Sequence, residues 1–108
     1  MIAVTHLTDD SADFTDRAHA ALAALAARPG YLRGSLARST DDPTAWVLLT
    51  EWRDVGSYRR ALGAYDVKLT ATPLFASALD LPAGFETLLD VAPGGAYDTR
   101  ASDREPGT

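Results

Sequence analysis

Apolar and polar positions follow two different periods in the N-terminal part of the chain. Residues 2–7, IAVTHL, are rich in apolar and β-branched types, which predicts a short strand. Thr8 to Ser11 are N-cap candidates that carry negative charge. Apolar residues then fall at i, i+4, i+7, i+8 and i+11, at Phe14, Ala18, Ala21, Leu22 and Leu25. This spacing predicts one apolar stripe on an amphipathic helix, which Pro29-Gly30 ends.

The middle of the chain predicts a hairpin followed by a helix. Residues 31–39, YLRGSLARS, and 45–53, AWVLLTEWR, are strand candidates, and TDDPT between them has the composition of a turn. Asp54 is a suitable N-cap for the helix that follows. Along that helix the apolar spacing is 4-3-4, at Tyr58, Leu62, Tyr65 and Leu69, and Gly63 weakens it locally.

Proline and glycine divide the remainder of the chain. Thr72-Pro73 is typical of a helix start and predicts a second short helix from residue 73 to about residue 80. Pro82 and Gly84 end it, and FETLLDV at 85–91 predicts the fourth strand. Residues 93–108 lack periodicity and are rich in Pro, Gly and charged residues, so we expect a flexible C-terminal tail.

The order strand, helix, strand, strand, helix, strand predicts an α+β fold. It is the ferredoxin-like βαββαβ arrangement, a four-stranded antiparallel sheet with its helices on one face, over residues 1–92. Trp46, Leu48 and Trp52 of the third strand point to one face, whereas Val47 and Leu49 point to the other. Both faces are therefore apolar, but helices cover only one of them. We expect a second copy of the chain to cover the other face, which makes a homodimer.

Composition excludes several classes of function. At 108 residues with 46% hydrophobic and 23% charged residues, the chain has the size and balance of one globular domain. The lack of cysteine excludes disulfides, thiolate nucleophiles and cysteine-ligated metals. A net charge of -5 without a basic run argues against nucleic acid and membrane as partners. We found no signal-type segment or apolar span, and we expect a cytoplasmic protein.

A longer segment, RPGYLRGSLARSTDDPTAWVLLTEWRDVGSYRRAL, resembles the antibiotic biosynthesis monooxygenase family of dimeric α/β barrels. The shared features are a helix ending in Pro-Gly-Tyr, an Asp-Asp-Pro turn, a strand ending in Glu51-Trp52, and a helix opened by Asp54 that carries Tyr58. The resemblance spans roughly residues 1–92 and is more specific for the fold than for the reaction. The same fold also houses haem-degrading oxygenases, polyketide cyclases and lactone isomerases.

The resemblance implies a pocket between the sheet and its own helices, with Trp52 and Tyr58 as catalytic candidates. In the family's cofactor-free members an Asn precedes the Trp by four residues, and that position is Leu48 here. The family's Arg position falls near Thr72. The histidine ligand of the haem-degrading branch corresponds to Leu62, so haem is not expected.

Four apolar or aromatic residues are expected to line the substrate pocket: Leu48, Leu62, Tyr65 and Phe75. His6 is our candidate base, since it is the histidine placed to reach the sheet interior, although a lone strand-end histidine is more often structural. A tryptophan placed like Trp46 belongs more often to the core than to a site. For Trp52 and Tyr58 the sequence supports a core role and a role in the site equally. Two histidines and an Asp-rich turn at 41–42 are too few ligands for a metal site.

The resemblance implies an enzyme of secondary metabolism that carries out a cofactor-independent oxidation of a flat, aromatic, polyketide-type substrate. A phenol or anthrone would lose a proton, and the resulting carbanion would reduce dioxygen directly. A dry cavity, a base and hydrogen-bond donors would suffice for this chemistry. Two alternatives stay open: a polyketide cyclase or isomerase of the same fold, and a non-catalytic dimer that binds a small molecule.

Overall fold

The computed structural model describes residues 1–102 of the 108-residue chain. Its main body has the following elements: β1 (Ile2–Thr8), α1 (Phe14–Ala26), β2 (Tyr31–Arg38), β3 (Ala45–Trp52), α2 (Val55–Leu62), α3 (Tyr65–Phe75) and β4 (Gly84–Phe85). Two further short strands, β5 (Leu89–Val91) and β6 (Tyr97–Thr99), follow the main body.

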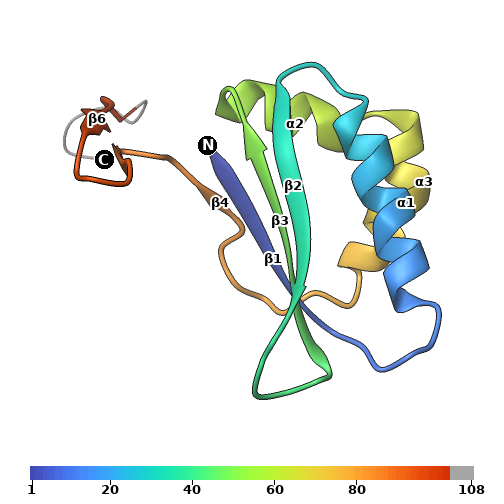
Figure 1. Ribbon diagram of the computed structural model, residues 1–108. Coiled ribbons are helices and arrows are strands. Elements are labelled where there is room, and N and C mark those ends of the chain that lie inside the picture. Colours follow the sequence, from blue (N-terminus) through green and yellow to red (C-terminus); the bar gives the residue numbers. More distant parts are fainter. Residues whose placement is uncertain (103–108) are drawn as a thin grey trace.

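One antiparallel sheet with the strand order β2-β3-β1-β4 forms the centre of the molecule. The inner strands β1 and β3 pair along their whole length, from Ile2 opposite Glu51 to Thr8 opposite Ala45. All three helices lie on one side of this sheet (Figure 1). The predicted α+β, ferredoxin-like architecture is therefore confirmed.

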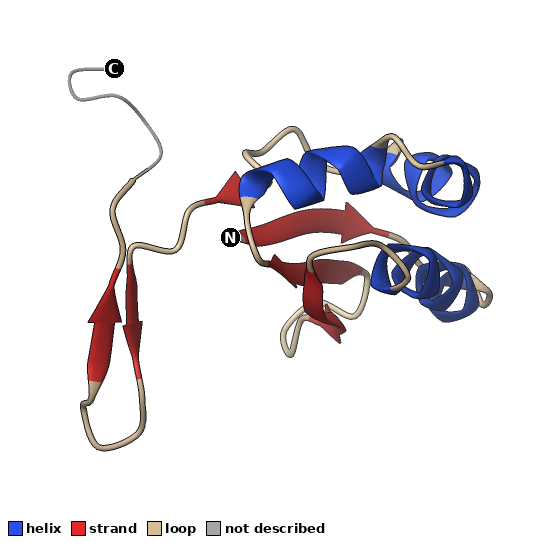
Figure 2. Ribbon diagram, turned by 90° about the horizontal axis from the view of Figure 1, so that it is seen from above, coloured by secondary structure: helices blue, strands red, loops and turns tan. Residues whose placement is uncertain are grey.

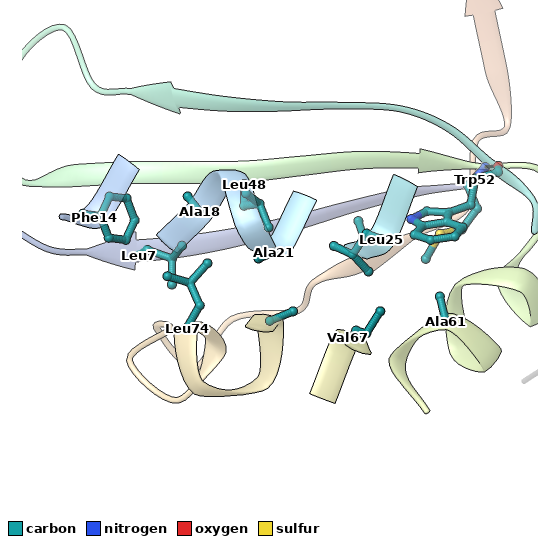
Figure 3. Packing of buried hydrophobic residues seen from close by; sticks show 13 residues of the cluster. Leu7, Phe14, Ala18, Ala21, Leu25, Leu48, Trp52, Ala61, Val67 and Leu74 are labelled. Atoms are coloured by element: carbon teal, nitrogen blue, oxygen red, sulfur yellow. Dashed lines mark hydrogen bonds between the residues drawn. The ribbon is translucent and has the colours of Figure 1, made fainter. Parts of the chain in front are cut away.

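The core fills the space between the sheet and the helices. Its buried apolar side chains are Met1, Ala3, Leu7, Phe14, Ala18, Ala21, Leu25, Leu48, Trp52, Ala61, Val67, Ala71 and Leu74. Figure 3 shows Phe14 near one end of this cluster and Trp52 near the other. Four residues of the stripe predicted for α1 are buried, and the fifth, Leu22, is half-buried and packs against the cluster. Asp54 also caps α2 as predicted, because its carboxylate accepts a hydrogen bond from the Ser57 N–H at 2.7 Å.

The second helical region differs from its prediction. The chain leaves the helical conformation at Ala64, where ψ is 144°, so α2 and α3 are separate helices. The break changes which side of α3 is buried, and Tyr65 and Leu69 become 75% and 57% exposed. A helix starting at residue 73 is also a wrong prediction, because Pro73 lies inside α3. Packing of α3 against α1 carries the helix past the proline despite the lost backbone N–H.

The predicted fourth strand is correct only at its beginning. Gly84 and Phe85 pair with β1, but the chain then leaves the sheet. Residues 89–91 pair instead with residues 97–99 in a separate hairpin. Gly94 and Gly95 turn that hairpin at φ values of 89° and 98°, a backbone conformation that favours glycine. Residues 89–91 therefore form a strand as predicted, but this strand pairs outside the four-stranded sheet in which it was expected.

This C-terminal hairpin, β5 with β6, projects away from the sheet and the helices in both views (Figures 1 and 2). Its large apolar side chains, Leu89, Val91 and Tyr97, are 57% to 69% exposed. The hairpin lies across residue 92, the expected end of the domain, and β6 belongs to the segment expected as a tail. Residues 103–108 of that segment lie outside the described residues.

Candidate functional site

Tyr58 on α2 borders two neighbouring cavities. The larger one has a volume of about 780 Å³, is open to solvent, and lies between α2 and the chain at 82–86. Its lining residues are Met1, Val55, Gly56, Tyr58, Arg59, Pro82, Ala83, Gly84, Phe85 and Glu86. The smaller one has a volume of about 150 Å³ and lies between β1, the end of α3 and residues 78–83. Because Tyr58 and Ala83 line both, we treat the two cavities as one candidate site.

The Tyr58 ring packs against Trp52, which belongs to a small aromatic cluster. Its centroid lies 5.8 Å from that of Trp52, which in turn contacts Tyr31 edge-on at 5.4 Å. The Tyr58 hydroxyl makes no hydrogen bond within residues 1–102. Because no fully buried polar side-chain atom in this part of the chain lacks a partner, the hydroxyl is accessible from outside the protein. Burial of the side chain raises the pKa of Tyr58. At neutral pH the Tyr58 hydroxyl is therefore uncharged and able to donate a hydrogen bond, and it belongs to a residue that lines both cavities.

Trp52 itself lies behind the site rather than in its lining. Its side chain is fully buried, and its indole N–H donates to Thr50 Oγ1 at 2.8 Å. This donor is therefore already used inside the protein. Trp46 behaves similarly at the far end of the sheet, where its N–H donates to the Asp9 carbonyl at 3.0 Å. Both indoles act as packing groups in this structure.

His6 borders the smaller cavity at the edge of β1, where its carbonyl accepts a hydrogen bond from the Leu79 N–H at 2.8 Å. Its side chain starts from the face of the sheet opposite the helices, because His6 pairs with Val47 whereas the neighbouring Leu7 is buried in the core. Tyr58 approaches from the helix side. His6 as a base thus stays a prediction.

The four expected pocket residues separate in the structure. Phe75 lines the smaller cavity together with Tyr58. Leu48 is 2% exposed and belongs to the core, and Leu62 is half-buried against it. Tyr65 is 75% exposed on the outer side of α3, because the break at Ala64 turned it away from the sheet.

Arg59 and the segment 82–86 are parts of the site that were not predicted from the sequence. Val55, Tyr58 and Arg59 stand at i, i+3 and i+4, so they share one side of α2 and line one cavity. The sequence contains that spacing, but the apolar positions of the same helix predict only its buried side. Segment 82–86 carries no comparable signal, because its position depends on the short β4 pairing with β1.

Neither a metal-binding cluster nor a membrane-spanning helix is present among residues 1–102. Within this part of the chain no group of three or more His, Asp or Glu side chains is placed to hold a metal ion. Nor does the same part contain a helix that is both long and apolar enough to cross a membrane.

Comparison with known structures extends the fold assignment. A variant of SnoaB, a cofactor-independent oxygenase from Streptomyces nogalater, has a TM-score of 0.65 and 21% identity, with 99% of this chain and 96% of that chain covered. A conserved protein from Methanosarcina mazei Go1 has a TM-score of 0.62 and 17% identity, with 77% of this chain and 84% of that chain covered. Rv0793 from Mycobacterium tuberculosis gives 0.61 and 14%, with coverage of 97% and 96%. At these identities the likeness shows the fold alone.

Comparison with family models is more specific. A search of curated proteins found no match. The family model described as antibiotic biosynthesis monooxygenase, however, matches residues 1–71, which include α1, the complete β1-to-β3 region and the Tyr58 helix. The chain belongs to the antibiotic biosynthesis monooxygenase family.

Proposed function

We propose that this protein is a cofactor-independent oxygenase of secondary metabolism that oxidises a flat, aromatic, polyketide-type substrate beside Tyr58. One observation carries the proposal: Tyr58, whose uncharged hydroxyl has no hydrogen-bond partner within residues 1–102, lines a large cavity in a protein of this family. The structural similarity to SnoaB, a cofactor-independent oxygenase, supports the same class of reaction.

The size and lining of the larger cavity suit such a substrate. Its volume of about 780 Å³ falls within the range of small-molecule sites, roughly 300 to 1,000 Å³. Met1, Val55 and Phe85 provide apolar surface for a ring system, and Tyr58 and Arg59 provide polar contacts. A few polar groups on an apolar wall orient a ligand without binding it in many ways.

In the proposed reaction, a methylene carbon of an anthrone-type substrate loses a proton to a base. The electron-rich carbanion then reduces dioxygen, and a new carbon–oxygen bond forms in a peroxide. Collapse of the peroxide leaves one oxygen as the quinone carbonyl and releases the other as water with the two methylene hydrogens. The Tyr58 O–H donates to the oxyanion that develops on the ring as the proton leaves. His6 is the proposed base.

The proposal includes a homodimer whose sheets pack face to face. The side of the sheet that carries no helix presents Ile2 and Val4 from β1 and Val47 and Leu49 from β3, all half-buried. We call these four residues the open face. Leaving this apolar surface in water is unfavourable, and a second copy offers an equally apolar surface to cover it.

Turnover of a polyhydroxylated anthrone, followed by chromatography with and without air, tests the proposed reaction. We expect quinone above the spontaneous background only in air. Tyr58→Phe should lower kcat/KM by about fivefold, the effect of one lost hydrogen bond. Tyr65→Phe, the same change on the exposed side of α3, should leave it unaltered.

The other outcomes separate the alternatives. A rearranged or cyclised product that forms equally without air would instead make the protein an isomerase or cyclase. Binding of the anthrone without any product would identify it as a small-molecule-binding protein.

A further inference from the structure

Arg59 places a positive charge in the wall of the larger cavity. It lines the cavity beside Tyr58, and within residues 1–102 its side chain makes no ion pair or hydrogen bond. Arg17, Arg33, Arg53 and Arg100, in contrast, each pair with a carboxylate. Arg28 also has no side-chain partner within residues 1–102, but it does not line the larger cavity, so the position of Arg59 in the cavity wall distinguishes it.

Among residues 1–102, no other charged group around the cavity forms an ion pair with Arg59. Glu86 lines the same cavity but is engaged in another interaction, and no ion pair joins it to Arg59. Arg53 and Arg100 line an adjacent cavity, where each is already paired, with Asp54 and Asp90 respectively. The Arg59 guanidinium is therefore a charged group of this cavity wall that no carboxylate of residues 1–102 pairs with.

We propose that Arg59 forms an anion-binding subsite and that the ligand of this cavity is an aromatic carboxylate. A planar guanidinium matches the geometry of a carboxylate through two parallel N–H···O bonds. Arg59 and Tyr58 are adjacent on α2 and line the same cavity, so one ligand can contact both. Arg59 holds the carboxylate while the Tyr58 hydroxyl donates to an oxygen on the ring system. The subsite thus selects acidic substrates and sets their orientation.

This inference rests on the proposed function only for the cavity as substrate site, so equilibrium binding tests it without turnover. The probes are anthracene-9-carboxylate and anthracene-9-methanol, which share a flat ring system and differ in charge. Their fluorescence reports Kd for the full chain and for Arg59→Gln. We expect the carboxylate to bind more tightly than the alcohol. Arg59→Gln should weaken carboxylate binding by about threefold to tenfold, since water screens an exposed pair, and leave alcohol binding unchanged.

Arg60→Gln is the matched control. It removes the same charge one residue further along α2, where Arg60 donates to Ser57 Oγ and does not line the cavity. The control should bind both probes like the parent protein, and added salt should weaken only carboxylate binding.

Equal affinity for both probes, equal effects of the two arginine variants, or binding of neither probe would overturn the subsite. Failure of anthrone oxidation would instead count against the proposed reaction and would leave the binding result standing.

Discussion

The two faces of the central sheet carry similar apolar residues but differ in what covers them. On the helix-covered face Leu48 is 2% exposed and Trp52 is fully buried. On the open face Val47 and Leu49, from the same strand, remain half-buried. A strand that alternates between two apolar faces has two surfaces to bury, and one chain supplies helices for only one of them. The covered face thus provides stability to the single chain, while the open face is the surface that the proposed dimer would bury.

The largest expected effect is on the stability of the covered face. Trp52→Ala should lower the free energy of unfolding by about 3 to 5 kcal/mol, because it removes a fully buried aromatic side chain. Leu49→Ala, on the open face, should cost less than about 1.5 kcal/mol in the monomer. Urea unfolding followed by circular dichroism, at concentrations low enough to avoid association, measures both. Similar losses in the two variants would mean that the faces are equally packed.

The next effect concerns the turn that joins α1 to β2 on the covered side. Gly30 has φ of 88°, and a Cβ there would meet the Ser57 side chain on α2. Gly30→Ala should therefore lower the free energy of unfolding by about 2 to 4 kcal/mol, from backbone strain and overpacking together.

Gly63→Ala provides the control for this turn. Gly63 has φ of -84°, and the nearest atom to an added Cβ is 3.5 Å away. We expect this variant to be neutral or slightly more stable, by up to about 1 kcal/mol. Thermal unfolding of both variants checks the pair, and a stable Gly30→Ala protein would show that the packing of α2 against this turn is loose.

Association should respond to the open face. Leu49→Asp should weaken the proposed dimer by about tenfold or more, because it places a charge in the apolar interface. Leu69→Asp makes the same change at a 57% exposed position on α3 and should leave the dimer intact. Sedimentation velocity over a dilution series measures both constants. A dimer that tolerates Leu49→Asp must use another surface.

The smallest effect is the pH dependence that arises from Tyr58. Burial raises the pKa of Tyr58 in the folded chain, so the folded state holds this proton more tightly than the unfolded state. The resulting stability is complete below the ordinary tyrosine pKa of about 10 and declines as the pH rises through the folded value. Tyr58→Phe should therefore flatten the loss of stability above pH 10. Tyr65→Phe should keep the parent profile, and urea midpoints from pH 8 to pH 11 compare the three proteins.

Local patterns determined much of this protein by themselves. The stripe on α1, the cap at Asp54 and the hairpin of β2 with β3 depend on residues close in the sequence, and the chain confirms them. Together with the Trp52–Tyr58 spacing, these features indicate the family to which the chain belongs.

Tertiary structure decided the rest, because the outcome depended on contacts between distant residues. Contact with α1 carried α3 past Pro73, although the same residues predicted a helix start. Residues 89–91 pair with β6 rather than with β1. Local β propensity does not distinguish between these two partners. The site followed the same rule: the indole N–H of Trp52 found its partner in Thr50, and Arg59 joined Tyr58 at a cavity whose other wall comes from residues 82–86. A sequence specifies which groups are available, whereas burial and distance, set by the whole fold, determine which of them stay free to meet a ligand.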